Sequence, residues 1–493
     1  MFEKIINSAR NFPNNNAFCI NEIYYSYQDT SKRINGIINL IQNSFGRNIG
    51  IVVYDDIETY ASILAVLLSG KTYVPINPHN PSDRNDNIIA QAEILTVLSS
   101  QLKNISDVLS DISAVNVLET SDIVDEKNML ENPEVDFEQN AYILFTSGST
   151  GIPKGVPIRL KNLNSFVSAF FELGYQLDET DRFLQIFDLT FDLSIMSYLI
   201  PLTIGACVYT VPSGEIKFTA AYSILEDHEI TVALMVPSIL SFLQKYYDEI
   251  RLEKMKYSLF CGEALYYDLT KGWAECVPNA LIQNVYGPTE ATIFCLTYNW
   301  YRASVNKNIN GIVCIGKPMN NILAIIVDSD FKPVAAGVHG ELCLSGNQLT
   351  AGYINNPEKN REAFFKLIVD GAEQIFYRTG DICYVDEEGD FMFIGRLDNQ
   401  VKIQGFRVEL SEIEHHAREF MKSTNAVALT SQNSDGNTLI HLFIENYNNT
   451  EELTAFLKTK LPSYMIPNEI RTLQKFPLNV NGKTDRNALK ALI

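Results

Sequence analysis

Cysteine pairs with metal-binding or redox spacing are absent from this sequence. Its eight cysteines are scattered, and none of them forms a C-x-x-C motif. The absence of such cysteine pairs argues against a disulfide framework and against a zinc knuckle, and it favours a reducing compartment. We therefore expect a cytoplasmic protein without structural disulfides.

Long apolar runs are also missing. No uninterrupted stretch of about 18 apolar residues occurs, which argues against a membrane span. The opening residues MFEKIINSARNFPNNNAF lack the apolar core of a secretory signal. We expect neither a secretory signal nor membrane insertion.

Positive charge is scarce. The sequence contains 39 lysine and arginine residues against 59 aspartate and glutamate residues, which gives a net charge of −20. A nucleic acid or an anionic membrane surface would be repelled by such a chain, so neither is expected as a partner. With 493 residues, 46% hydrophobic and 20% charged, the chain is typical of a globular protein with more than one core.

Strand and helix patterns alternate from the N-terminus to about residue 300. A β-branched run at 48–53 precedes an amphipathic stretch at 59–69, and a run at 230–236 precedes another stretch at 238–247. This alternation predicts α/β layers built on largely parallel sheets. From about residue 321 the pattern changes to strands separated by Gly, Pro and Asp turns, which predicts a β-rich module.

A second, smaller domain is expected at the C-terminal end. After Asp398 comes VKIQGFRVEL, then a predicted helix at 411–421, then further strands and helices. We expect an α/β protein whose large N-terminal region, 1–397, contains two α/β layers plus the β-rich module. A small α+β domain is expected at 398–493.

The strongest local signal is a strand followed by a polar loop, AYILFTSGSTGIPKGV at residues 141–156. Glycines let successive backbone N–H groups converge on an anion, hydroxyls add donors, and Lys154 supplies positive charge. The loop is not a Walker A loop, because Pro153 stands where that motif needs glycine and Gly155 where it needs Ser or Thr. The residues therefore predict a triphosphate site of another kind; a solvated turn is the alternative.

Further motifs extend this signal over nearly the whole chain. They are FDLSIM at 191–196, NVYGPTE at 284–290, YRTGD at 377–381, GRLDNQVKIQGFRVEL at 395–410 and NGKTDR at 481–486. In this order they resemble the adenylate-forming superfamily of acyl-CoA synthetases, luciferases and peptide-synthetase adenylation domains. The resemblance implies that ATP, with Mg²⁺, activates a carboxylate as an acyl-AMP with release of pyrophosphate, before a thiol takes over the acyl group.

The resemblance also implies an ATP site in these motifs. Asn284 would bond the adenine edge and Tyr286 would stack on the ring, while Thr289 would contact the α-phosphate. Glu290 would hold Mg²⁺, which prefers hard oxygen ligands. The full set expected to bind ATP is Thr146, Ser147, Gly148, Ser149, Thr150, Gly151, Lys154, Asn284, Val285, Tyr286, Gly287, Pro288, Thr289, Asp381, Arg396 and Lys483.

Lys483, in NGKTDR, is the expected catalytic residue. By the resemblance, its mobile ammonium reaches the α-phosphate and the substrate carboxylate and offsets charge on both. The small domain would present Lys483 for adenylation and then pivot at a hinge, Asp398, to present another face for thioester formation. Asp381 would accept hydrogen bonds from two ribose hydroxyls, and Arg396 would meet ribose or phosphate.

Asp192, in FDLSIM, indicates an amino acid as the substrate. In amino-acid-activating members an aspartate at this place pairs with the substrate ammonium, which would be costly to bury alone. Asp188, in FDLT, has a similar setting, but FDLS followed by Ile-Met fits the pattern better. The remaining pocket residues, aligned from flanking motifs, are nearly all apolar and several are bulky, which predicts a small uncharged side chain. They are Leu193, Met196, Leu234, Leu259, Cys261, Val285, Ile293 and Phe294, with Lys483 at the substrate carboxylate.

One branch of the superfamily is especially similar. FDLSIM and FCGEAL, at 260–265, resemble D-alanine–D-alanyl carrier protein ligases, in which the cysteine before the glycine helps to discriminate the configuration of the α-carbon. We therefore expect D-alanine as substrate and the phosphopantetheine thiol of an acyl or peptidyl carrier protein as acceptor. The chain departs from that branch at Leu234, Val285, Ile293 and Phe294. A freestanding peptide-synthetase-type adenylation enzyme for another small amino acid therefore stays open.

Two further interpretations remain. An acyl-CoA synthetase would use coenzyme A and an acid without an amino group, which the aspartate of FDLSIM argues against. A silent binding or scaffold protein would have no chemical reason to keep Lys154, Glu290 and Lys483 together. We expect no permanent metal site, because His415 and His416 lack further ligands at suitable spacing and are expected on a solvated helix face.

Overall fold

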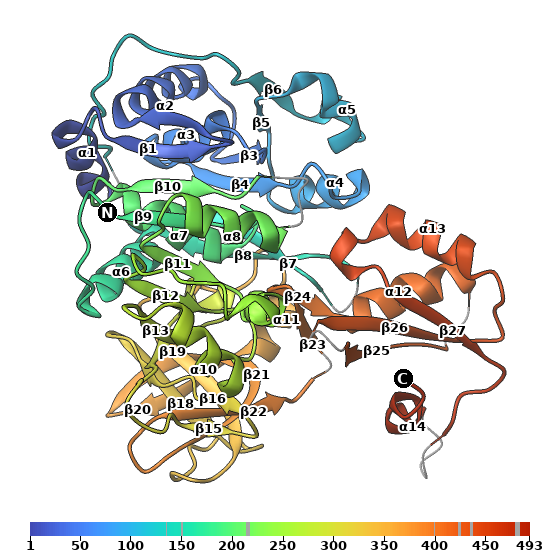
Figure 1. Ribbon diagram of the computed structural model, residues 1–493. Helices are drawn as coiled ribbons and strands as arrows, with labels where there is room; N and C mark the ends of the chain where they lie inside the picture. Colours follow the sequence, from blue (N-terminus) through green and yellow to red (C-terminus); the bar gives the residue numbers. More distant parts are fainter. Residues whose placement is uncertain are drawn as a thin grey trace.

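Two parts of unequal size make up the chain, and they meet near residue 398 (Figure 1). The computed structural model describes residues 1–134, 136–148, 151–212, 217–398, 400–422, 425–433, 437–478 and 484–493. Among these residues, each cluster of packed hydrophobic side chains contains either only residues up to Phe393 or only residues from Val401 onward. The two parts therefore share no hydrophobic core. The predicted boundary between residues 397 and 398 lies within this gap and itself stays a prediction.

A nine-stranded sheet forms the centre of the large part, with the spatial order β17-β14-β13-β12-β11-β9-β10-β1-β2. The inner strands run parallel, whereas β2, β14 and β17 are antiparallel strands at the edges. The inner strands are apolar because both of their faces are covered, as in the fully buried VALM of β11. The strands are β1 (Asn16–Ile20), β2 (Ile23–Ser26), β9 (Arg182–Gln185), β10 (Cys207–Thr210), β11 (Val232–Met235), β12 (Tyr257–Phe260), β13 (Leu281–Tyr286), β14 (Leu296–Asn299) and β17 (Lys317–Pro318).

A six-stranded sheet lies beside it, with the order β6-β5-β3-β4-β7-β8. Its neighbours are parallel except for β7 and β8, which form an antiparallel pair. One hydrophobic cluster takes residues from both sheets, so the two α/β layers are joined into a single body. The strands are β3 (Asn48–Val52), β4 (Thr72–Ile76), β5 (Thr96–Ser99), β6 (Asn116–Glu119), β7 (Asn140–Thr146) and β8 (Lys154–Arg159).

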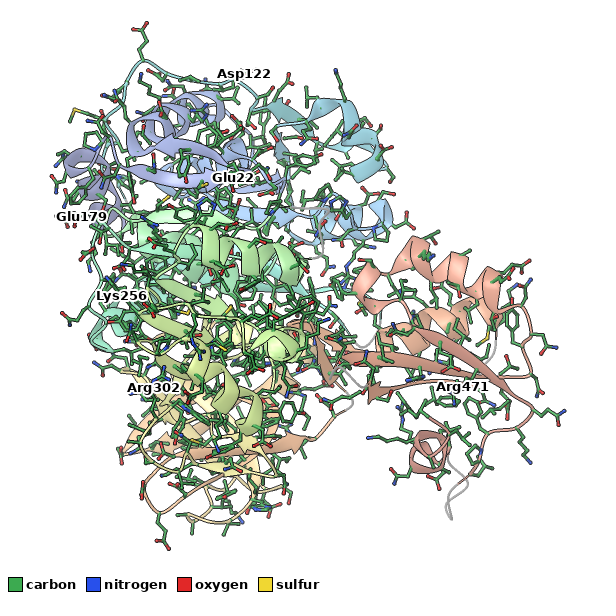
Figure 2. All side chains as sticks on the ribbon, viewed as in Figure 1. Glu22, Asp122, Glu179, Lys256, Arg302 and Arg471 are labelled. Atoms are coloured by element: carbon green, nitrogen blue, oxygen red, sulfur yellow. The ribbon has the colours of Figure 1, made fainter. Side chains whose placement is uncertain are left out.

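Helices cover these sheets. Helix α3 is buried on nearly all sides because it packs on β3 and β4 and against α2. The carbonyls near the end of α10 accept hydrogen bonds from Arg302 (Figure 2), which satisfies groups that have no partner within the helix. The helices of the large part are α1 (Phe2–Asn11), α2 (Tyr27–Ile41), α3 (Ile57–Leu68), α4 (Ser82–Gln91), α5 (Ile105–Val108), α6 (Leu160–Glu172), α7 (Asp192–Leu202), α8 (Lys217–Asp227), α9 (Ser238–Leu243), α10 (Tyr267–Cys276) and α11 (Pro357–Ala363).

The β-rich module predicted from about residue 321 is present. It is a five-stranded antiparallel sheet in which β18, β19, β21 and β20 follow one another and β22 also pairs with β21. A two-stranded ribbon, β15 and β16, precedes it along the chain. The strands are β15 (Asn308–Ile309), β16 (Ile312–Val313), β18 (Ile322–Val327), β19 (Gly340–Gly346), β20 (Phe364–Val369), β21 (Ala372–Val385) and β22 (Phe391–Arg396).

The small part combines a hairpin, a three-stranded sheet and helices, which confirms the predicted α+β character. The hairpin of β23 and β24 leads into α12, and β25, β26 and β27 form the sheet, with Arg471 on β27 (Figure 2). The elements are β23 (Gln400–Ile403), β24 (Phe406–Glu409), α12 (Leu410–Met421), β25 (Ala426–Gln432), β26 (Thr438–Glu445), α13 (Thr450–Lys460), β27 (Glu469–Leu473) and α14 (Arg486–Lys490).

No helix within the described ranges is both long and apolar enough to cross a membrane. The expected α/β class with a large N-terminal region and a small α+β domain is confirmed in its architecture. Predicted helix 411–421 corresponds to α12, and predicted strand 48–53 corresponds to β3.

Gly287 allows the loop after β13 to fold back on itself. The backbone N–H of Cys295 donates to the carbonyl of Tyr286 at 2.7 Å, which closes the loop. A Cβ atom at Gly287 would lie 2.4 Å from the Cα of Phe294 and 2.8 Å from the carbonyl oxygen of Ile293. Because both contacts are with backbone, no rotation of a side chain can relieve them.

We expect Gly287→Ala to destabilise the large part by about 1–3 kcal/mol, the usual cost of overpacking a close contact. The melting temperature of the purified protein measures the effect. Gly395→Ala is the matched control, because a Cβ atom there meets nothing within 4 Å. Equal melting temperatures for the two variants would contradict the close-packing argument.

Candidate functional site

The predicted phosphate loop connects two antiparallel strands. It leaves β7 at Thr146 and returns at Lys154 in β8, and these two residues are partners in the ladder. A strand–loop–strand setting differs from the strand–loop–helix of a Walker A loop, as the sequence predicted. The buried hydroxyl of Thr146 has no hydrogen-bond partner among the described residues, so it can bind a ligand. Ser149, Thr150 and Lys483 lie outside the described residues, so their predicted roles stay predictions.

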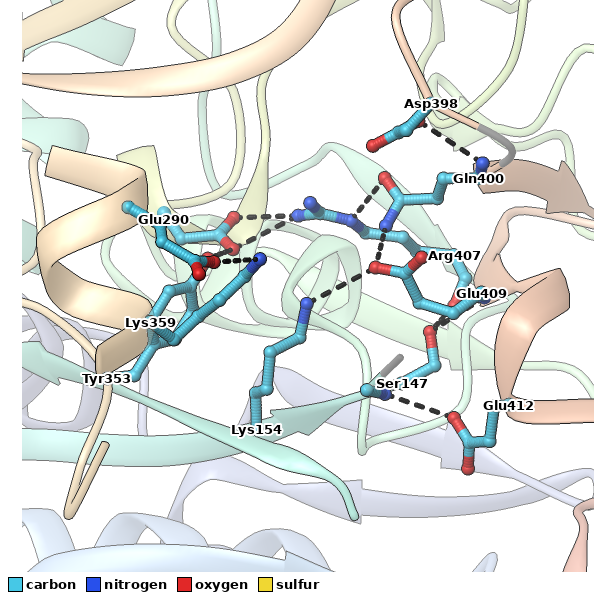
Figure 3. A network of polar contacts seen from close by, with 12 residues as sticks. Ser147, Lys154, Glu290, Tyr353, Lys359, Asp398, Gln400, Arg407, Glu409 and Glu412 are labelled. Atoms are coloured by element: carbon cyan, nitrogen blue, oxygen red, sulfur yellow. Dashed lines mark hydrogen bonds and ion pairs between the residues drawn. The ribbon is translucent and has the colours of Figure 1, made fainter. Parts of the chain in front are cut away.

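The small part covers this loop with a carboxylate. Glu412, on the first turn of α12 and 0% exposed, accepts the backbone N–H of Gly148 at 3.0 Å (Figure 3). Its other oxygen accepts Arg84 of α4 at 2.6 Å. Ser147 donates its hydroxyl to the carbonyl oxygen of Arg407 at 2.7 Å. Ser147 and Gly148 of the loop thus form hydrogen bonds with groups of the small part, at the position where the sequence predicted bound phosphates.

Lys154 is also paired across the two parts. Its ammonium lies 3.3 Å from the carboxylate of Glu409, and the lysine side chain is only 7% exposed. Burial lowers the pKa of Lys154, with a further contribution from the neighbouring Arg407 guanidinium. Gln400 donates to the same Glu409 oxygen at 2.8 Å. A buried ammonium with an anionic partner therefore lies at the end of the predicted phosphate loop, and the phosphate-binding role of Lys154 stays a prediction.

Glu290 is a fully buried carboxylate with a cation beside it. The guanidinium of Arg407 donates to its two oxygens at 2.9 and 3.1 Å, and Tyr353 donates to one of them at 2.6 Å. Burial opposes ionisation, but Arg407 and Tyr353 outweigh it, so the pKa of Glu290 lies below its ordinary value. An ionised, buried carboxylate fits a divalent cation, provided that Arg407 has moved away.

A cavity of about 660 Å³ brings together the residues predicted for adenosine. Asn284, Tyr286, Asp381 and Arg396 all line it. The amide N–H groups of Asn284 are used by backbone carbonyls of the ribbon region, at 3.2 and 2.9 Å. The amide oxygen of Asn284 is an acceptor, which suits the amino group of adenine.

Asp381 and Arg396 form one unit with the predicted hinge residue. Asp381 accepts the hydroxyl of Tyr286 and the guanidinium of Arg396, the latter at 2.6 Å. Arg396 also donates to both carboxylate oxygens of Asp398, at 2.7 and 2.8 Å. The residue predicted as hinge is thereby connected to the residue predicted for ribose. A hinge role for Asp398 stays a prediction.

Asp192 begins α7 with a buried carboxylate. It is 6% exposed, and one of its oxygens is buried without a hydrogen-bond partner in the described part of the chain. Burial raises the pKa of Asp192 to about 6, although the neighbouring Thr289 hydroxyl lowers it in part. Asp188 differs, because its oxygens accept from Asn77 at 2.5 Å and from the backbone and hydroxyl of Thr190 at 2.8 and 2.6 Å. The carboxylate of Asp188 thus stabilises a turn, whereas the carboxylate of Asp192 has an oxygen that can bind a ligand.

A small cavity of about 60 Å³ lies next to Asp192. Its wall contains Leu193, Cys261, Thr289 and, from the small part, Lys402. Burial raises the pKa of Cys261 to about 12, so this cysteine is a neutral thiol. The other predicted pocket residues do not line the cavity but pack behind its wall, each at most 2% exposed: Met196, Leu234, Leu259, Val285, Ile293 and Phe294.

The backbone behind this cavity is strained. Thr292 and Ile293 have φ angles of +57° and +74°, in the left-handed region that β-branched residues rarely adopt. The hydroxyl of Thr292 donates to the carbonyl of Gln348 at 2.5 Å, and Phe294 packs edge-to-face on Phe166 at 5.0 Å between ring centroids. Such strain, held by surrounding contacts, is typical of binding sites.

The tip of the hairpin β23–β24 enters the site from the small part. Glu263 of the large part accepts the backbone N–H of Gly405 at 2.9 Å and that of Ser238 at 2.8 Å. Phe406 stacks on Tyr464 at 3.8 Å and meets Phe191 edge-on at 4.6 Å. The hairpin therefore covers the small cavity.

Several residues at the site had no individual role in the sequence-based prediction: Arg84, Glu263, Tyr353, Lys402, Arg407, Glu409 and Glu412. Arg407 and Glu409 stand two residues apart on β24, so both side chains lie on the same face of the strand. This two-residue spacing could have been recognised in the sequence. Arg84 gave no such signal, because its partner lies 328 residues away.

His415 and His416 lie on α12, and their surroundings differ in part from the prediction. His415 is exposed, as expected, but His416 is half-buried, and burial lowers its pKa. A Cβ atom at Gly151 would lie 2.7 Å from a ring carbon of His415 and 3.2 Å from a ring nitrogen of His416, so both rings lie against the phosphate loop. The expectation that no further ligand stands nearby was wrong, because Glu419, one turn along the helix, lies 3.3 Å from His416.

Comparison with known proteins agrees with this geometry. The family model of the AMP-binding enzymes matches residues 6–354. A linear gramicidin synthase of Brevibacillus parabrevis is 32% identical over 452 residues, which cover 90% of this chain but only 8% of that protein. Zwittermicin A synthase ZmaJ of Bacillus cereus is 30% identical over 483 residues, which cover 95% of this chain and 90% of ZmaJ.

A solved structure of similar fold is the adenylation domain AlmE of Vibrio cholerae, in complex with glycyl-adenosine-5′-phosphate. Its TM-score is 0.89 at 25% identity, and the alignment covers 100% of this chain and 97% of AlmE. None of these proteins is a D-alanine–D-alanyl carrier protein ligase, so the similarity to that branch is not confirmed by them. The chain belongs to the AMP-binding enzyme family, which is to say the adenylate-forming enzymes.

Proposed function

We propose that this protein activates a small amino acid, with D-alanine as the favoured candidate, and transfers it to the phosphopantetheine thiol of a carrier protein. In the first step a substrate carboxylate oxygen attacks the α-phosphorus of ATP. The bond from that phosphorus to the bridging oxygen breaks, and pyrophosphate leaves. In the second step the thiolate sulfur attacks the acyl carbon, and the carbon–oxygen bond to AMP breaks.

The observation that carries the proposal is the buried carboxylate of Asp192, one oxygen of which has no partner among the described residues. An ammonium placed beside it would relieve the cost of that buried charge and lower its raised pKa. A fatty or aryl acid has no group to do so. The site of Asp192 therefore favours an amino acid over the substrates of an acyl-CoA synthetase.

The small cavity supports a small substrate. Its volume of about 60 Å³, with bulky side chains packed behind the wall, suits a hydrogen or methyl side chain. Cys261 on that wall supports D-alanine by its resemblance to the D-alanine ligases. Glycine is the second candidate, because the structurally similar AlmE was solved with glycyl-adenosine-5′-phosphate.

The ATP site would use the residues that the large cavity gathers. Asn284 would accept from the adenine amino group, Tyr286 would stack, and Asp381 would bind ribose. Glu290 would hold Mg²⁺, which neutralises charge on the triphosphate. The loop that follows β7, together with Lys154 at its end, would hold the β- and γ-phosphates, and the predicted catalytic lysine of NGKTDR would reach the α-phosphate.

The thiol would approach between the two parts. The cavity of about 660 Å³ continues from the adenosine residues to small-part residues including Lys402, Thr430 and Lys490. Lys402 also lines the cavity next to Asp192. A phosphopantetheine arm entering by this path would meet an acyl group held at Asp192.

The first test is amino-acid-dependent exchange of pyrophosphate into ATP, measured with glycine, both alanine enantiomers, serine, valine and small acids without an amino group. We expect exchange with D-alanine or glycine and little with valine, because the cavity has no room for a branched side chain. Exchange only with acids that lack an amino group, followed by coenzyme A turnover, would contradict the proposal. A higher exchange rate with glycine than with D-alanine would change the proposed substrate to glycine but would leave the proposed reaction unchanged.

Lys483→Ala should lower amino-acid-dependent exchange by several orders of magnitude, because the variant removes the ammonium that offsets charge in the transition state. Binding of ATP, measured by calorimetry, should be largely kept. The matched control is Lys475→Ala, which removes an exposed lysine from an earlier position in the same stretch of sequence and should keep full exchange. Full exchange in Lys483→Ala would remove this residue from the mechanism.

Asp192→Asn should lower kcat/KM for the amino acid, because loss of one partner of a buried charge pair costs about 2–5 kcal/mol. That range corresponds to a loss of about 30-fold or more. Asp188→Asn is the matched control, since Asp188 serves a turn, and it should keep most of the activity. A larger loss of kcat/KM in Asp188→Asn than in Asp192→Asn would identify Asp188 as the partner of the ammonium.

The pH profile adds a second readout for Asp192. Burial raises its pKa to about 6 in the free protein, and protonation removes the charge that attracts the ammonium. The kcat/KM of the unmodified protein should therefore fall as the pH is lowered through about 6, a step that Asp192→Asn should lack.

A further inference from the structure

Three side chains of metal-binding types meet near the edge of the nine-stranded sheet. Cys19 stands on β1, Glu22 in the turn between β1 and β2 (labelled in Figure 2), and His228 directly after α8. The sulfur of Cys19, a carboxylate oxygen of Glu22 and a ring nitrogen of His228 all lie within 4.8 Å of one another. None of the three residues lines either of the cavities described above. The cluster is therefore separate from the residues proposed for ATP and for the amino acid.

Two of these side chains are held by the sheet. Cys19, which is 4% exposed, is the ladder partner of Tyr209 on β10 and of Tyr24 on β2. The ring of Tyr209 lies 4.9 Å from the ring of His228, measured between centroids. The Nε2 atom of His228 lies 3.0 Å from the Oε1 atom of Glu22, whose side chain is 74% exposed. A cation could thus reach two fixed groups from solvent on the side of Glu22.

Glu22 occupies a backbone position that favours glycine. Asn21 and Glu22 form the two-residue turn of the hairpin, with φ angles of +50° and +63°. Positive φ at both central residues describes a type I′ turn, in which glycine is the common second residue. An ion pair with an exposed carboxylate adds little stability. The contact with His228 alone therefore does not explain a glutamate at this position.

A cavity of about 190 Å³ opens beside the cluster, and Cys19, Glu22 and His228 line it. Thr210, at the end of β10, also lines this cavity and is 4% exposed. Its hydroxyl is buried without a hydrogen-bond partner among the described residues. A buried polar group of this kind calls for a partner, which a ligand or a bound water would supply.

We propose that Cys19, Glu22 and His228 bind a zinc ion whose fourth coordination position opens into this cavity. Thiolate, imidazole and carboxylate are the ligands that zinc takes in proteins, whereas magnesium and calcium prefer oxygen alone. The thiol of Cys19 gives its proton to solvent as the zinc–sulfur bond forms. A water on zinc would donate a hydrogen bond to the hydroxyl oxygen of Thr210.

The spacing of the ligand atoms suits this ion. With bond lengths of about 2.0–2.3 Å, tetrahedral zinc holds its ligand atoms about 3.3–3.6 Å apart. Small side-chain movements bring the three atoms to this spacing. The ion would connect the β1–β2 turn to the end of α8, which lie 206 positions apart in the chain. This separation explains why the sequence did not indicate the site.

The test uses the metal-free full chain and cobalt(II) as the probe, because a thiolate bound to cobalt gives an intense charge-transfer absorption in the near ultraviolet. We expect this absorption to reach its maximum at one cobalt per chain and to disappear when zinc is added. A second group that could bind a metal, His415, His416 and Glu419, contains no cysteine and would not give this signal.

Cys19→Ser should lose the charge-transfer absorption, and His228→Ala should bind zinc at least about 100-fold more weakly, since even the loss of an outer-shell partner costs about 10–100-fold. Cys207→Ser is the matched control, because it changes a buried cysteine on the adjacent strand β10 and should keep the signal. Absence of the absorption from the unmodified protein would overturn the inference, and so would its persistence in Cys19→Ser.

Glu22→Gly separates binding of zinc from a purely structural role and does not depend on the folding of Cys19→Ser. Without metal, its melting temperature should equal or exceed that of the unmodified protein, because glycine adopts the turn at lower cost. Zinc should raise the melting temperature of the unmodified protein, as a ligand of the folded state does, but raise that of the variant much less. Equal zinc affinity of the two proteins, measured with a competing chelator, would contradict the assignment of Glu22. None of these measurements involves ATP or an amino acid, so they do not depend on the proposed function.

Discussion

Arg84, Lys154, Asp192 and Glu290 carry charge where solvent barely reaches, each at most 7% exposed. A charge buried in this way is tolerable only with a partner, and this requirement governs the whole site. Three of the four are neutralised by the small part of the chain. The fourth, Asp192, keeps an oxygen without a hydrogen-bond partner among the described residues, and this oxygen is the one that we propose to bind a cationic substrate group.

This requirement explains why the site lies between two bodies rather than inside one. The phosphate loop, Glu290 and Asp192 belong to the large part, whereas the charged partners of Lys154 and Glu290 come from the small part. Under the proposed function, a movement of the small part would let these partners change between the two steps of the reaction. Arg396 connects Asp398, the predicted hinge, to Asp381, the residue proposed for ribose, through hydrogen bonds of 2.6 to 2.8 Å.

The sequence predicted much of this architecture because its motifs are local. The strand and loop around Lys154, the α/β alternation and the β-rich module all follow from periodicity and turn residues. The pairing of Arg84 with Glu412 could not be predicted in this way, because it joins residues 328 positions apart and depends on how the two parts meet. The pocket shows a second limit: alignment proposed Met196 and Phe294 as pocket residues, but neither lines the small cavity, which only the structure reveals.

The central claim is that Asp192 binds the ammonium of an amino acid, and affinity measures it most directly. Two non-reactive adenylate analogues, with a sulfamate in place of the phosphate, would be compared by calorimetry: D-alanyl sulfamoyl adenosine and its counterpart with the amino group replaced by hydrogen. The account predicts that the amino analogue binds at least about 30-fold more tightly, and that Asp192→Asn removes this difference. Equal affinities of the two analogues for the unmodified protein would contradict the account.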